Sequence, residues 1–299
     1  MPIDTAFRPR RSVLYVPASS DKALAKVASL ACDAVIIDLE DAVAPEEKAA
    51  ARAGLERFFS GPRAPRREIA IRVNALSGEW GEDDLRLAAR LKPDAILLPK
   101  VDMPRDILEA GDLLDDEGAP DTVALWAMVE TSRAMLNIGA IAELGRDPAS
   151  RLECLVAGTN DLVKETGIRP GAGRHVLVPW LMQIVLAARA GGLDLLDGVY
   201  NDFRDGDGFA RECAEAAAMG FDGKTLIHPT QIEAANAAFS PSPEAVADAR
   251  AVVAAFDRPE NAGRGVIALE GRMVERLHLA QAEKLLAKAA RLEPSSHEG

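Results

Sequence analysis

The stretch Val123-Ala-Leu-Trp-Ala-Met-Val129 is apolar at every position and ends at a carboxylate, Glu130. A strand with one face in water alternates apolar and polar residues, whereas a strand that is covered on both faces is apolar throughout. The stretch is therefore typical of a strand in a parallel sheet. Its charged last residue marks the point at which the strand ends and a loop begins.

Similar apolar runs alternate with longer helical stretches along the chain, in eight repeats. Eight strand–helix units with a parallel-sheet signature predict an α/β fold, a TIM (β/α)8 barrel. A doubly wound sheet is the alternative, but its first strand is normally followed by a glycine-rich phosphate turn, and here that turn reads Pro17-Ala-Ser-Ser20. The expected strands are Ser12–Ala18, Ala34–Glu40, Glu68–Asn74, Asp94–Lys100, Thr122–Glu130, Leu152–Gly158, Leu195–Asn201 and Gly223–His228.

The repeat pattern stops at Ser240-Pro-Ser-Pro243. We expect a C-terminal helical extension beyond it, with one helix over Pro243–Phe256, flexible residues 259–265, and a last helix from about Arg272 to Arg291. The sequence thus predicts two domains, a catalytic barrel over residues 1–239 and an extension over residues 240–299. Such an extension needs a surface to pack on, either the mouth of its own barrel or a neighbouring subunit.

Composition excludes several classes of function. The formal net charge of −12 argues against a nucleic-acid partner, because phosphate backbones attract a basic surface. The N-terminal residues contain no apolar signal segment, and no run of apolar residues is long enough to cross a membrane. The three cysteines are far apart and lack metal-binding spacing, so we expect buried free thiols and a cytoplasmic protein.

Charged and amide side chains stand at the ends of most of the expected strands. Catalytic groups of TIM barrels lie where strands end and βα loops begin, so these side chains are expected to ring one mouth of the barrel. They are Asp38, Glu40, Asp41, Arg72, Asn74, Lys100, Glu130, Asn160, Asp161, Asn201, Asp202 and His228.

Carboxylates gathered at one place repel each other unless a cation holds them. Arg72 and Lys100 supply part of that charge, and a divalent metal ion would supply the rest. Oxygen ligands with only four histidines in the chain favour Mg²⁺ over Zn²⁺, with Mn²⁺ as an alternative. The predicted metal ligands are Glu130 and Asp161, from adjacent strands.

Each of these two carboxylates also has a structural interpretation. Asp161 is placed to cap a helix that starts near Leu162, and the sequence favours capping and metal binding equally. Glu130 is less suited to capping, because Thr131 or Ser132 would cap the next helix more naturally. Metal binding is therefore the preferred prediction for Glu130.

Arg72 lies between Ile71 and Val73, so its side chain is expected to point to the opposite face, towards the barrel interior or its mouth. The structural alternative is an ion pair with Glu40 or Glu68. In the acidic segment Asp38-Leu-Glu-Asp41, at least one carboxylate is expected to orient other side chains rather than bind ligand itself.

Two further motifs have weaker functional interpretations. His228, which precedes Pro229, is more typical of a residue that fixes a loop by hydrogen bonding than of a catalytic base. Gly171-Ala-Gly173-Arg174 would suit an anion at a helix N-terminus, but a plain loop is the favoured interpretation.

At this level of detail the sequence resembles the HpcH/HpaI aldolase and citrate lyase β-subunit superfamily, in its CoA-ester lyase branch. The resemblance covers nearly the whole chain in order. Its motifs are Arg11-Ser-Val-Leu-Tyr-Val-Pro17, Asp38-Leu-Glu-Asp-Ala-Val43, Pro45-Glu-Glu-Lys48, Ile71-Arg-Val-Asn74, Leu98-Pro-Lys-Val101, Glu130-Thr-Ser132, Gly158-Thr-Asn-Asp-Leu162 and Gly223-Lys-Thr-Leu-Ile-His-Pro229.

The resemblance implies a carbon–carbon lyase that cleaves or forms a 3-hydroxyacyl-CoA ester, of the malyl-, methylmalyl-, citramalyl- or citryl-CoA type, with an acyl-CoA and a 2-oxo acid as the other reactants. It implies that Glu130 and Asp161 hold Mg²⁺ and that Arg72 grips the substrate carboxylate. We expect Lys100 and Asn74 to help bind the substrate. The resemblance also implies a homotrimer or hexamer in which the C-terminal segment reaches a neighbour's active site.

One segment departs from the family pattern. Many relatives have an aspartate in a C-terminal Gly-x-Met-Ile-Asp stretch that serves as acid or base, whereas this chain reads Glu270-Gly-Arg-Met-Val-Glu275. We expect Glu275 to take the catalytic role, with a solvated helix face as the structural alternative. The cations that CoA phosphates would meet are Lys22, Lys26, Arg10 or Arg11, unless these are ordinary surface charges.

Two other functions stay open. One is a class II metal-dependent aldolase that acts on free 4-hydroxy-2-oxo acids without CoA. The other is a catalytically silent subunit that binds an acyl carrier, because a fold does not fix a function.

Overall fold

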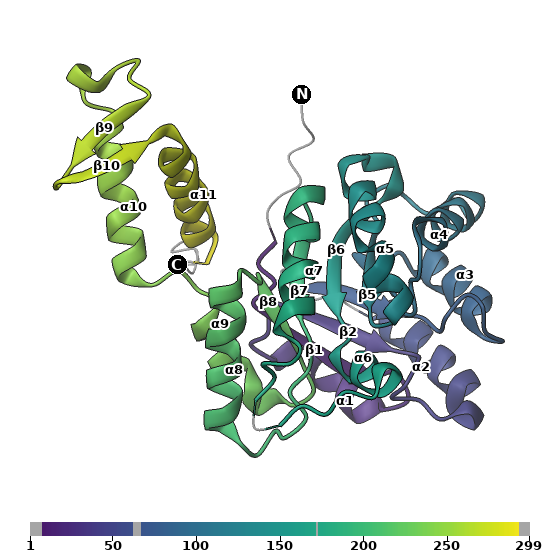
Figure 1. The fold of residues 1–299 in the computed structure, drawn as a ribbon. Helices are drawn as coiled ribbons and strands as arrows, with labels where there is room; N and C mark the ends of the chain where they lie inside the picture. Colours follow the sequence, from purple (N-terminus) through teal and green to yellow (C-terminus); the bar gives the residue numbers. More distant parts are fainter. Residues whose placement is uncertain (1–7, 62–66, 172, 293–299) are drawn as a thin grey trace. The chain divides into compact units, whose positions relative to one another are not determined.

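Figure 1 shows the computed structural model of the chain, which describes residues 8–61, 67–171 and 173–292. Two compact units contain these residues, one over Arg10–Phe239 and the other including residues 240–292.

Eight parallel strands of the first unit close into a barrel, in chain order from β1 to β8, and β8 pairs with β1. This confirms the predicted TIM barrel. The observed strands are shorter than predicted, and only Asp38 and Arg72 of the predicted mouth residues still lie within a strand. Their bounds are Ser12–Pro17 (β1), Ala34–Asp38 (β2), Glu68–Arg72 (β3), Ala95–Leu98 (β4), Ala124–Val129 (β5), Leu152–Ala157 (β6), Asp194–Asp197 (β7) and Gly223–Leu226 (β8).

Helices follow every strand and surround the barrel, with two of them, α6 and α7, between β6 and β7. Their bounds are Asp21–Lys26 (α1), Lys48–Ser60 (α2), Gly81–Leu91 (α3), Pro104–Asp116 (α4), Ser132–Glu143 (α5), Thr159–Thr166 (α6), Val178–Gly191 (α7), Gly206–Met219 (α8) and Ile232–Ala238 (α9).

The continuous apolar sequence of β5 has a direct structural cause. Trp126 and Met128 belong to a cluster inside the barrel. Leu125, Ala127 and Val129 belong to the larger cluster between the strands and the helices. Because both faces of the strand are buried, neither admits polar residues until the strand ends.

At the N-terminal end of the barrel a buried arginine connects three strands. Arg10 donates two hydrogen bonds to Glu68 of β3, at 2.7 and 2.8 Å, and further bonds to Asp194 of β7 at 2.8 Å and Glu153 of β6 at 3.0 Å. Its guanidinium carbon lies 4.8 Å from the centroid of the Trp126 ring. The barrel base is therefore closed by charge-assisted bonds as well as by apolar packing.

The second unit contains helix α10 (Pro243–Phe256), an antiparallel hairpin of β9 (Val266–Leu269) and β10 (Arg272–Glu275), and helix α11 (Arg276–Leu292). The helix at Pro243–Phe256 is confirmed at both ends. The prediction that the last helix begins near Arg272 was wrong, because that segment is a strand. The hairpin turns at Glu270 and Gly271, which both have positive φ, at 51° and 77°.

Two sequence expectations concern the whole chain. Cys32, Cys154 and Cys213 are buried free thiols, as predicted. Among the described residues, no helix has the length and apolar character needed to cross a membrane.

Candidate active site

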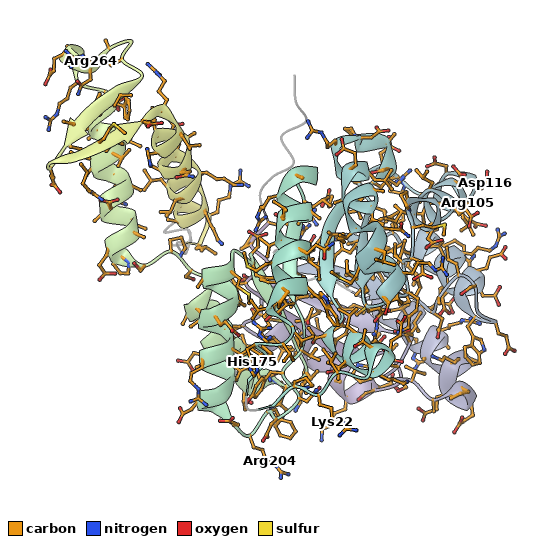
Figure 2. The ribbon with its side chains drawn as sticks, viewed as in Figure 1. Lys22, Arg105, Asp116, His175, Arg204 and Arg264 are labelled. Atoms are coloured by element: carbon orange, nitrogen blue, oxygen red, sulfur yellow. The ribbon has the colours of Figure 1, made fainter. Side chains whose placement is uncertain are left out.

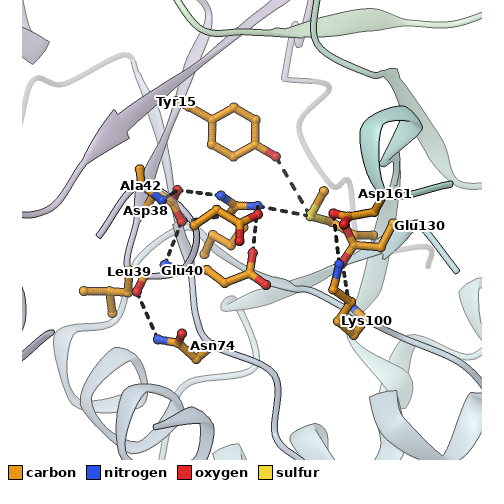
Figure 3. Close-up of polar contacts among 12 residues, drawn as sticks. Tyr15, Asp38, Leu39, Glu40, Ala42, Asn74, Lys100, Glu130 and Asp161 are labelled. Atoms are coloured by element: carbon orange, nitrogen blue, oxygen red, sulfur yellow. Dashed lines mark hydrogen bonds and ion pairs between the residues drawn. The ribbon is translucent and has the colours of Figure 1, made fainter. Parts of the chain in front are cut away.

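The centre of the barrel mouth is occupied by Arg72, the last residue of β3. Its side chain is 7% exposed and lies on the interior face, while Ile71 and Val73 pack against the helices, as the alternation predicted. Its Nε and Nη2 donate to the two oxygens of Asp38 at 2.7 and 2.5 Å. Asp38 also accepts the backbone N–H groups of Glu40 and Ala42, at 2.9 and 3.1 Å. Asp38 therefore fixes both the guanidinium and the loop that follows β2 (Figure 3).

Glu40 takes the other arm of Arg72. Its Oε2 lies 2.8 Å from Nη1, in an ion pair that lacks the alignment of a hydrogen bond. Burial raises the pKa of Glu40 to about 8, and the nearby carboxylates of Asp41 and Glu130 add to the rise, against the opposing charge of Arg72. Asp41, which is mostly exposed, lies 3.5 Å from the same nitrogen. The predicted ion pair between Arg72 and Glu40 is thus present, whereas Glu68 pairs with Arg10 instead.

Tyr15 and Met128 complete the surroundings of Arg72 and were missed by the sequence reasoning. The guanidinium carbon lies 4.9 Å from the centroid of the Tyr15 ring, an arrangement that favours the cation. The Sδ of Met128 lies 3.9 Å from Nη1 and 4.0 Å from the Tyr15 hydroxyl. Burial raises the pKa of Tyr15 well above its ordinary value, so its hydroxyl keeps its proton. Tyr15 follows Val13 at the spacing of one strand face, which was the available signal.

Asn74 has its side-chain amide engaged within the chain. Its Nδ2 donates to Asp84 at 2.5 Å and to the Leu39 carbonyl at 3.0 Å, while its Oδ1 accepts from Lys48 at 2.9 Å. The buried Lys48 ammonium also bonds the carbonyls of Leu39 and Glu40. In the structure Asn74 therefore holds the loop that carries Glu40, and its contact with substrate stays a prediction.

A second charged group lies near Glu40, whose pKa the Glu130 carboxylate of this group helps to raise. The Nζ of Lys100 is 2.9 Å from an oxygen of Asp161 and 3.4 Å from Oε1 of Glu130 (Figure 3). Glu130 is 1% exposed, whereas the side chain of Asp161 is 29% exposed. The structure thus brings together the two carboxylates predicted from the sequence, at the ends of β5 and β6, around one cation.

The backbone at Lys100 is shaped to hold Glu130. Lys100 has a φ of 52°, in the left-handed region that costs an ordinary residue about 1 kcal/mol. In this conformation its N–H donates to Oε1 of Glu130 at 2.7 Å. Gly158 gives Glu130 its space, because a Cβ at that position would lie 2.3 Å from the Glu130 Cβ.

The protonation equilibria of this group follow its burial. Burial raises the pKa of Glu130, although the Lys100 charge opposes the rise and the Asp161 carboxylate adds to it. For Asp161, burial also acts upward, but the hydrogen bond and charge of Lys100 outweigh it and lower the pKa. Burial acts downward on the pKa of Lys100, yet its bond to Asp161 and the charge of Glu130 raise it overall. Lys100 is therefore a full positive charge in this arrangement.

The helices near Glu130 and Asp161 begin at other residues, α5 after Thr131 and α6 after Gly158. Thr131 caps α5, with its side chain accepting the Ala134 N–H, as expected. Gly158 is the N-cap residue of α6, and Asp161 lies inside the first turn without capping it. Neither Glu130 nor Asp161 is therefore needed to terminate a helix.

The residues present fit a magnesium ion. Oε2 of Glu130 is buried and receives no hydrogen bond from an N–H or hydroxyl donor among the described residues, and its carboxyl group lies within hydrogen-bond range of Asp161, so two carboxyl groups in contact face a position that suits a cation. Both side chains offer hard oxygen donors. Within the described ranges, no group of three or more His, Cys, Asp or Glu converges as a complete cage. Mg²⁺ typically takes one or two protein carboxylates and keeps waters for its other positions.

A cleft of about 330 Å³ opens beside Lys100. Loops after β3 and β4 line it, and its wall includes Leu76, Pro99, Met103 and Arg133. It provides room for part of a substrate next to the charged group.

Other predicted mouth residues have local roles. Asn160 and Asn201 form two hydrogen bonds with each other, at 2.9 and 3.1 Å. His228 bonds Thr230 at 2.8 Å and stacks on Phe203, which agrees with its predicted loop-fixing role.

Arg174 is held inside the chain rather than free for an anion. It donates to both oxygens of the fully buried Asp197, at 2.7 and 2.8 Å, and to Glu215 at 2.9 Å. The favoured interpretation of its segment as a plain loop agrees with this anchoring.

The four cations proposed for CoA phosphates divide between the two ends of the barrel. Arg10 and Arg11 precede β1, at the base, and Arg11 is paired with Asp33 at 2.7 Å. Lys22 and Lys26 are exposed on α1, which follows β1, and Figure 2 shows Lys22 pointing away from the ribbon. Of the four, Lys22 lies in the first turn of the helix that leaves the mouth, and Lys26 is the last residue of that helix.

Glu275 is the last residue of β10, in the second unit. Its backbone N–H donates to Nδ1 of His278 at 3.0 Å, and its side chain is partly exposed. The alternative of a solvated helix face was wrong, because the residue lies in a hairpin. Its catalytic role stays a prediction.

Comparisons with known proteins identify the family of the chain. Residues 11–229 match the family model described as HpcH/HpaI aldolase/citrate lyase. The chain is 47% identical over 281 residues to a (3S)-malyl-CoA thioesterase of Cereibacter sphaeroides, covering 94% of this chain and 95% of the relative. It is 35% identical to the human mitochondrial citramalyl-CoA lyase, covering 94% and 86%.

Among solved structures, CitE of Mycobacterium tuberculosis in complex with magnesium, acetoacetate and coenzyme A is similar with a TM-score of 0.74 and 34% identity, covering 93% of this chain and 97% of that one. The expectation of magnesium and a CoA thioester agrees with the ligands in that structure. The fold, the motifs and these relatives together show that the chain is an enzyme of the HpcH/HpaI aldolase/citrate lyase family, to which carbon–carbon lyases belong.

Proposed function

We propose that the protein is a magnesium-dependent lyase that splits a malyl-type 3-hydroxyacyl-CoA into an acyl-CoA and a 2-oxo acid. The observation that carries the proposal is the position of two carboxylates, Glu130 and Asp161, around one cation at the barrel mouth, where β3 also ends in Arg72. Such a mouth offers a metal site and a carboxylate-binding guanidinium close together. A short hydroxy acid attached to CoA needs both.

Each residue has a defined task in this proposal. Glu130 and Asp161 hold Mg²⁺, which acts as a Lewis acid and template for the substrate hydroxyl and carboxylate. Arg72 binds the substrate carboxylate through Nη1, where the substrate replaces Glu40, and Asp38 fixes the plane of the guanidinium through the other two nitrogens. Tyr15 covers the face of the guanidinium and excludes water from it.

Cleavage of the carbon–carbon bond of the thioester needs no second reactant. A base removes the proton of the substrate hydroxyl, the hydroxyl carbon becomes a carbonyl, and the carbon–carbon bond breaks. Its electron pair passes to the acyl-CoA fragment as an enolate, which an acid then protonates at carbon. We assign the proton transfer at carbon to Glu275, contributed by the second unit of a neighbouring subunit.

Thioester hydrolysis is a second candidate, because the relatives named (3S)-malyl-CoA thioesterase are 47% identical over nearly the full length. In that reaction water attacks the thioester carbonyl, the carbon–sulfur bond breaks, and the CoA thiolate takes a proton. The substrate and its binding groups are the same in both reactions. The difference lies in which bond of the bound thioester is exposed to attack.

Product analysis separates the two reactions. Purified protein is incubated with (3S)-malyl-CoA and Mg²⁺ in ¹⁸O-water, and the products are measured by mass spectrometry. Lyase activity gives acetyl-CoA and glyoxylate, whereas hydrolysis gives free CoA and malate with ¹⁸O in its carboxyl group. Malate and CoA as the sole products from the start would replace the lyase proposal with the hydrolase.

Further assays address the other functions. Cleavage of a free 4-hydroxy-2-oxo acid, with no turnover of any acyl-CoA and 2-oxo-acid pair, would identify an aldolase. No turnover in either assay would support the silent acyl-carrier-binding subunit. Asp161→Ala should abolish both activity and its dependence on Mg²⁺; persistent metal-stimulated turnover would reassign the ligand.

We also propose that the protein is a cytoplasmic homo-oligomer. Val266, Met273 and Leu277 of the second unit are 48%, 68% and 62% exposed, which suits a contact with another subunit. The three free thiols suit a reducing compartment. Light scattering of the purified protein measures the oligomeric state, and a monomer would contradict this part.

A further inference from the structure

The ammonium of Lys100 lies in the gap between the two proposed metal ligands. Its Nζ is 2.9 Å from Asp161 and 3.4 Å from Glu130, so its distances to the two carboxylates are those of an ion pair. A magnesium ion shared by the same carboxylates would lie about 2.1 Å from each oxygen. Two cations cannot share such a gap, because their mutual repulsion rises steeply at short distance.

We infer that Lys100 is the resident counter-ion of the metal site: its ammonium pairs with Glu130 and Asp161 in the metal-free protein and leaves them when Mg²⁺ binds. Lysine and metal thus compete for the same two carboxylates. This inference rests on the proposed function in one respect, namely that Glu130 and Asp161 are the metal ligands.

The backbone allows the side chain to leave without loss of the site. Oε1 of Glu130 is held by the Lys100 backbone N–H at 2.7 Å, and this bond does not depend on where the Lys100 side chain points. Oε2 of Glu130 is buried and receives no hydrogen bond from an N–H or hydroxyl donor in the described parts of the chain, while the Glu130 carboxyl lies within hydrogen-bond range of the Asp161 carboxyl. The ammonium therefore leaves these two carboxyl groups in contact with each other. A metal ion approaching Oε2 would meet a ligand oxygen whose carboxylate is already oriented by the Lys100 N–H.

The side chain also has a place to go. Lys100 is 36% exposed at its side chain, and it lines the cleft of about 330 Å³ beside the charged group. A long flexible lysine can therefore move its ammonium into water while its stem stays against the wall of the cleft. A fully buried lysine would have no such route.

Competition has a measurable consequence. The apparent affinity of a ligand is the intrinsic affinity multiplied by the fraction of the protein that is competent to bind it. The paired ammonium lowers that fraction and therefore weakens the apparent affinity for Mg²⁺. Removing the ammonium should therefore tighten metal binding, although it removes a side chain from the site. A lysine that merely braced the site would have the opposite effect when removed.

The test is calorimetric titration of Mg²⁺ into metal-stripped protein. Lys100→Met should bind Mg²⁺ about tenfold more tightly than the wild type or better, and Lys100→Arg, which keeps the charge, should stay near the wild type. The matched control is Lys164→Met. Lys164 is an exposed cation on the same helix as Asp161, three residues away; its charge helps to lower the pKa of Asp161, but it forms no ion pair with Asp161 within the described residues, so it reports the general electrostatic field alone.

The outcomes separate three roles of Lys100. Tighter Mg²⁺ binding in Lys100→Met, with less than a twofold change in Mg²⁺ affinity in Lys164→Met, supports competition between lysine and metal for the two carboxylates. Equal tightening in both variants would mean that only the general electrostatic field matters and would overturn the inference. Unchanged or weaker binding in Lys100→Met would also overturn it.

A second measurement follows the side chain itself. Lysines are labelled by reductive ¹³C-methylation, and the Lys100 resonance is identified by its absence from Lys100→Arg. Addition of Mg²⁺ should move this resonance to the position of the exposed lysines. A resonance that does not move would show that the ammonium stays in place, and the inference would fail.

Asp161→Asn distinguishes failure of this inference from failure of the proposed metal site. If the wild type binds Mg²⁺ and Asp161→Asn does not, the metal site stands, and an unchanged Lys100→Met refutes the counter-ion role alone. If the wild type binds no Mg²⁺, or if Asp161→Asn binds it equally well, both proposals are wrong.

Discussion

Arg72 and Asp38 form a two-pronged ion pair across neighbouring strands, with nitrogen–oxygen distances of 2.7 and 2.5 Å. Because Asp38 is itself fixed by two backbone N–H groups, the plane of the guanidinium is set before any ligand arrives. A preset plane reduces the entropy that a bound carboxylate would otherwise lose when it is oriented. The pair therefore orients Arg72, and a substrate carboxylate would replace Glu40 at Nη1, the nitrogen that Asp38 does not use.

Arg72→Ala should lower kcat/KM for a malyl-type thioester by more than about 30-fold, equivalent to about 2 kcal/mol of transition-state stabilisation, because the substrate carboxylate loses its partner. Steady-state kinetics measures the change. Arg90→Ala, at an exposed arginine of α3, is the control and should be silent. An unchanged rate in Arg72→Ala would remove this residue from the active site.

Gly158→Ala should weaken Mg²⁺ binding more than about tenfold, because the added Cβ would lie 2.3 Å from the Cβ of Glu130 and 2.9 Å from its Oε2. The φ of Gly158 is −93°, so alanine meets no backbone strain there. Gly139→Ala in α5 adds a methyl group with no described atom within 4 Å and serves as the control. Equal affinities in calorimetry for both variants would show that Glu130 does not contribute to the metal site.

Glu40→Gln should change how stability depends on pH. The pKa of Glu40 is raised from 4.5 to about 8, mainly by burial, so the folded protein keeps a proton that the unfolded chain loses. The free energy of unfolding of the wild type therefore falls as the pH rises through this window. Gln has no proton to lose. The difference in free energy of unfolding between Glu40→Gln and the wild type should therefore grow in favour of the variant by up to about 1.4 kcal/mol per pH unit and level off above the pKa of Glu40 in the folded protein.

Urea unfolding between pH 5 and 9 gives these free energies directly. The exposed Glu56 of α2 provides the comparison, Glu56→Gln, whose stability profile should run parallel to that of the wild type. A parallel profile for Glu40→Gln as well would contradict the raised pKa of Glu40.

Glu275→Gln should reduce kcat by roughly 100-fold or more, as expected for loss of a general acid or base, with Mg²⁺ affinity unchanged. Glu283→Gln, at an exposed position of α11, is the control. Full turnover in Glu275→Gln would assign the proton transfer to another residue.

A mixture of Arg72→Ala and Glu275→Gln tests whether one active site uses residues of two subunits. If it does, mixed oligomers contain some sites with both native residues, and activity returns after the two inactive proteins are unfolded and refolded together. No recovery would confine each site to one chain.

The sequence predicts the barrel well because its strands are buried on both faces. Every expected strand is present, since continuous apolar runs such as 123–129 leave few other interpretations. The ends were less accurate: the seventh strand was expected at Leu195–Asn201 and lies at Asp194–Asp197. Side chains at the barrel mouth are stabilised by water or ligand and not by packing on the sheet. The pattern of apolar residues therefore does not locate the last residue of a strand.

The hairpin Val266–Glu275 was missed although it carries a local signal. Buried Ile267 and Val274 alternate with exposed residues, which is the period of a strand with one face in water. Glu270-Gly271 forms the two-residue turn that such hairpins favour. The helical expectation extended the strong periodicity of α11 too far towards the N-terminus.

The sequence predicted the charged residues of the candidate site but not the residues that surround them. Arg72, Glu130 and Asp161 could be found because charge at a strand end has few structural explanations. Tyr15 was missed although its spacing from Val13 placed it on the interior face of its strand. Lys48 could not be found, because its role depends on contacts with residues distant in the chain. Pattern along a sequence does not show which loop a buried lysine will reach.

Arg10 and its three carboxylate partners, Glu68, Asp194 and Glu153, close the base of the barrel through β3, β7 and β6. This group of four includes none of the residues at the mouth. Loops that decide the chemistry can therefore be exchanged for those of relatives with other activities while the base keeps its bonds. For enzyme engineering, this makes the chain a suitable scaffold for loop grafting, with the strand ends as the natural junctions.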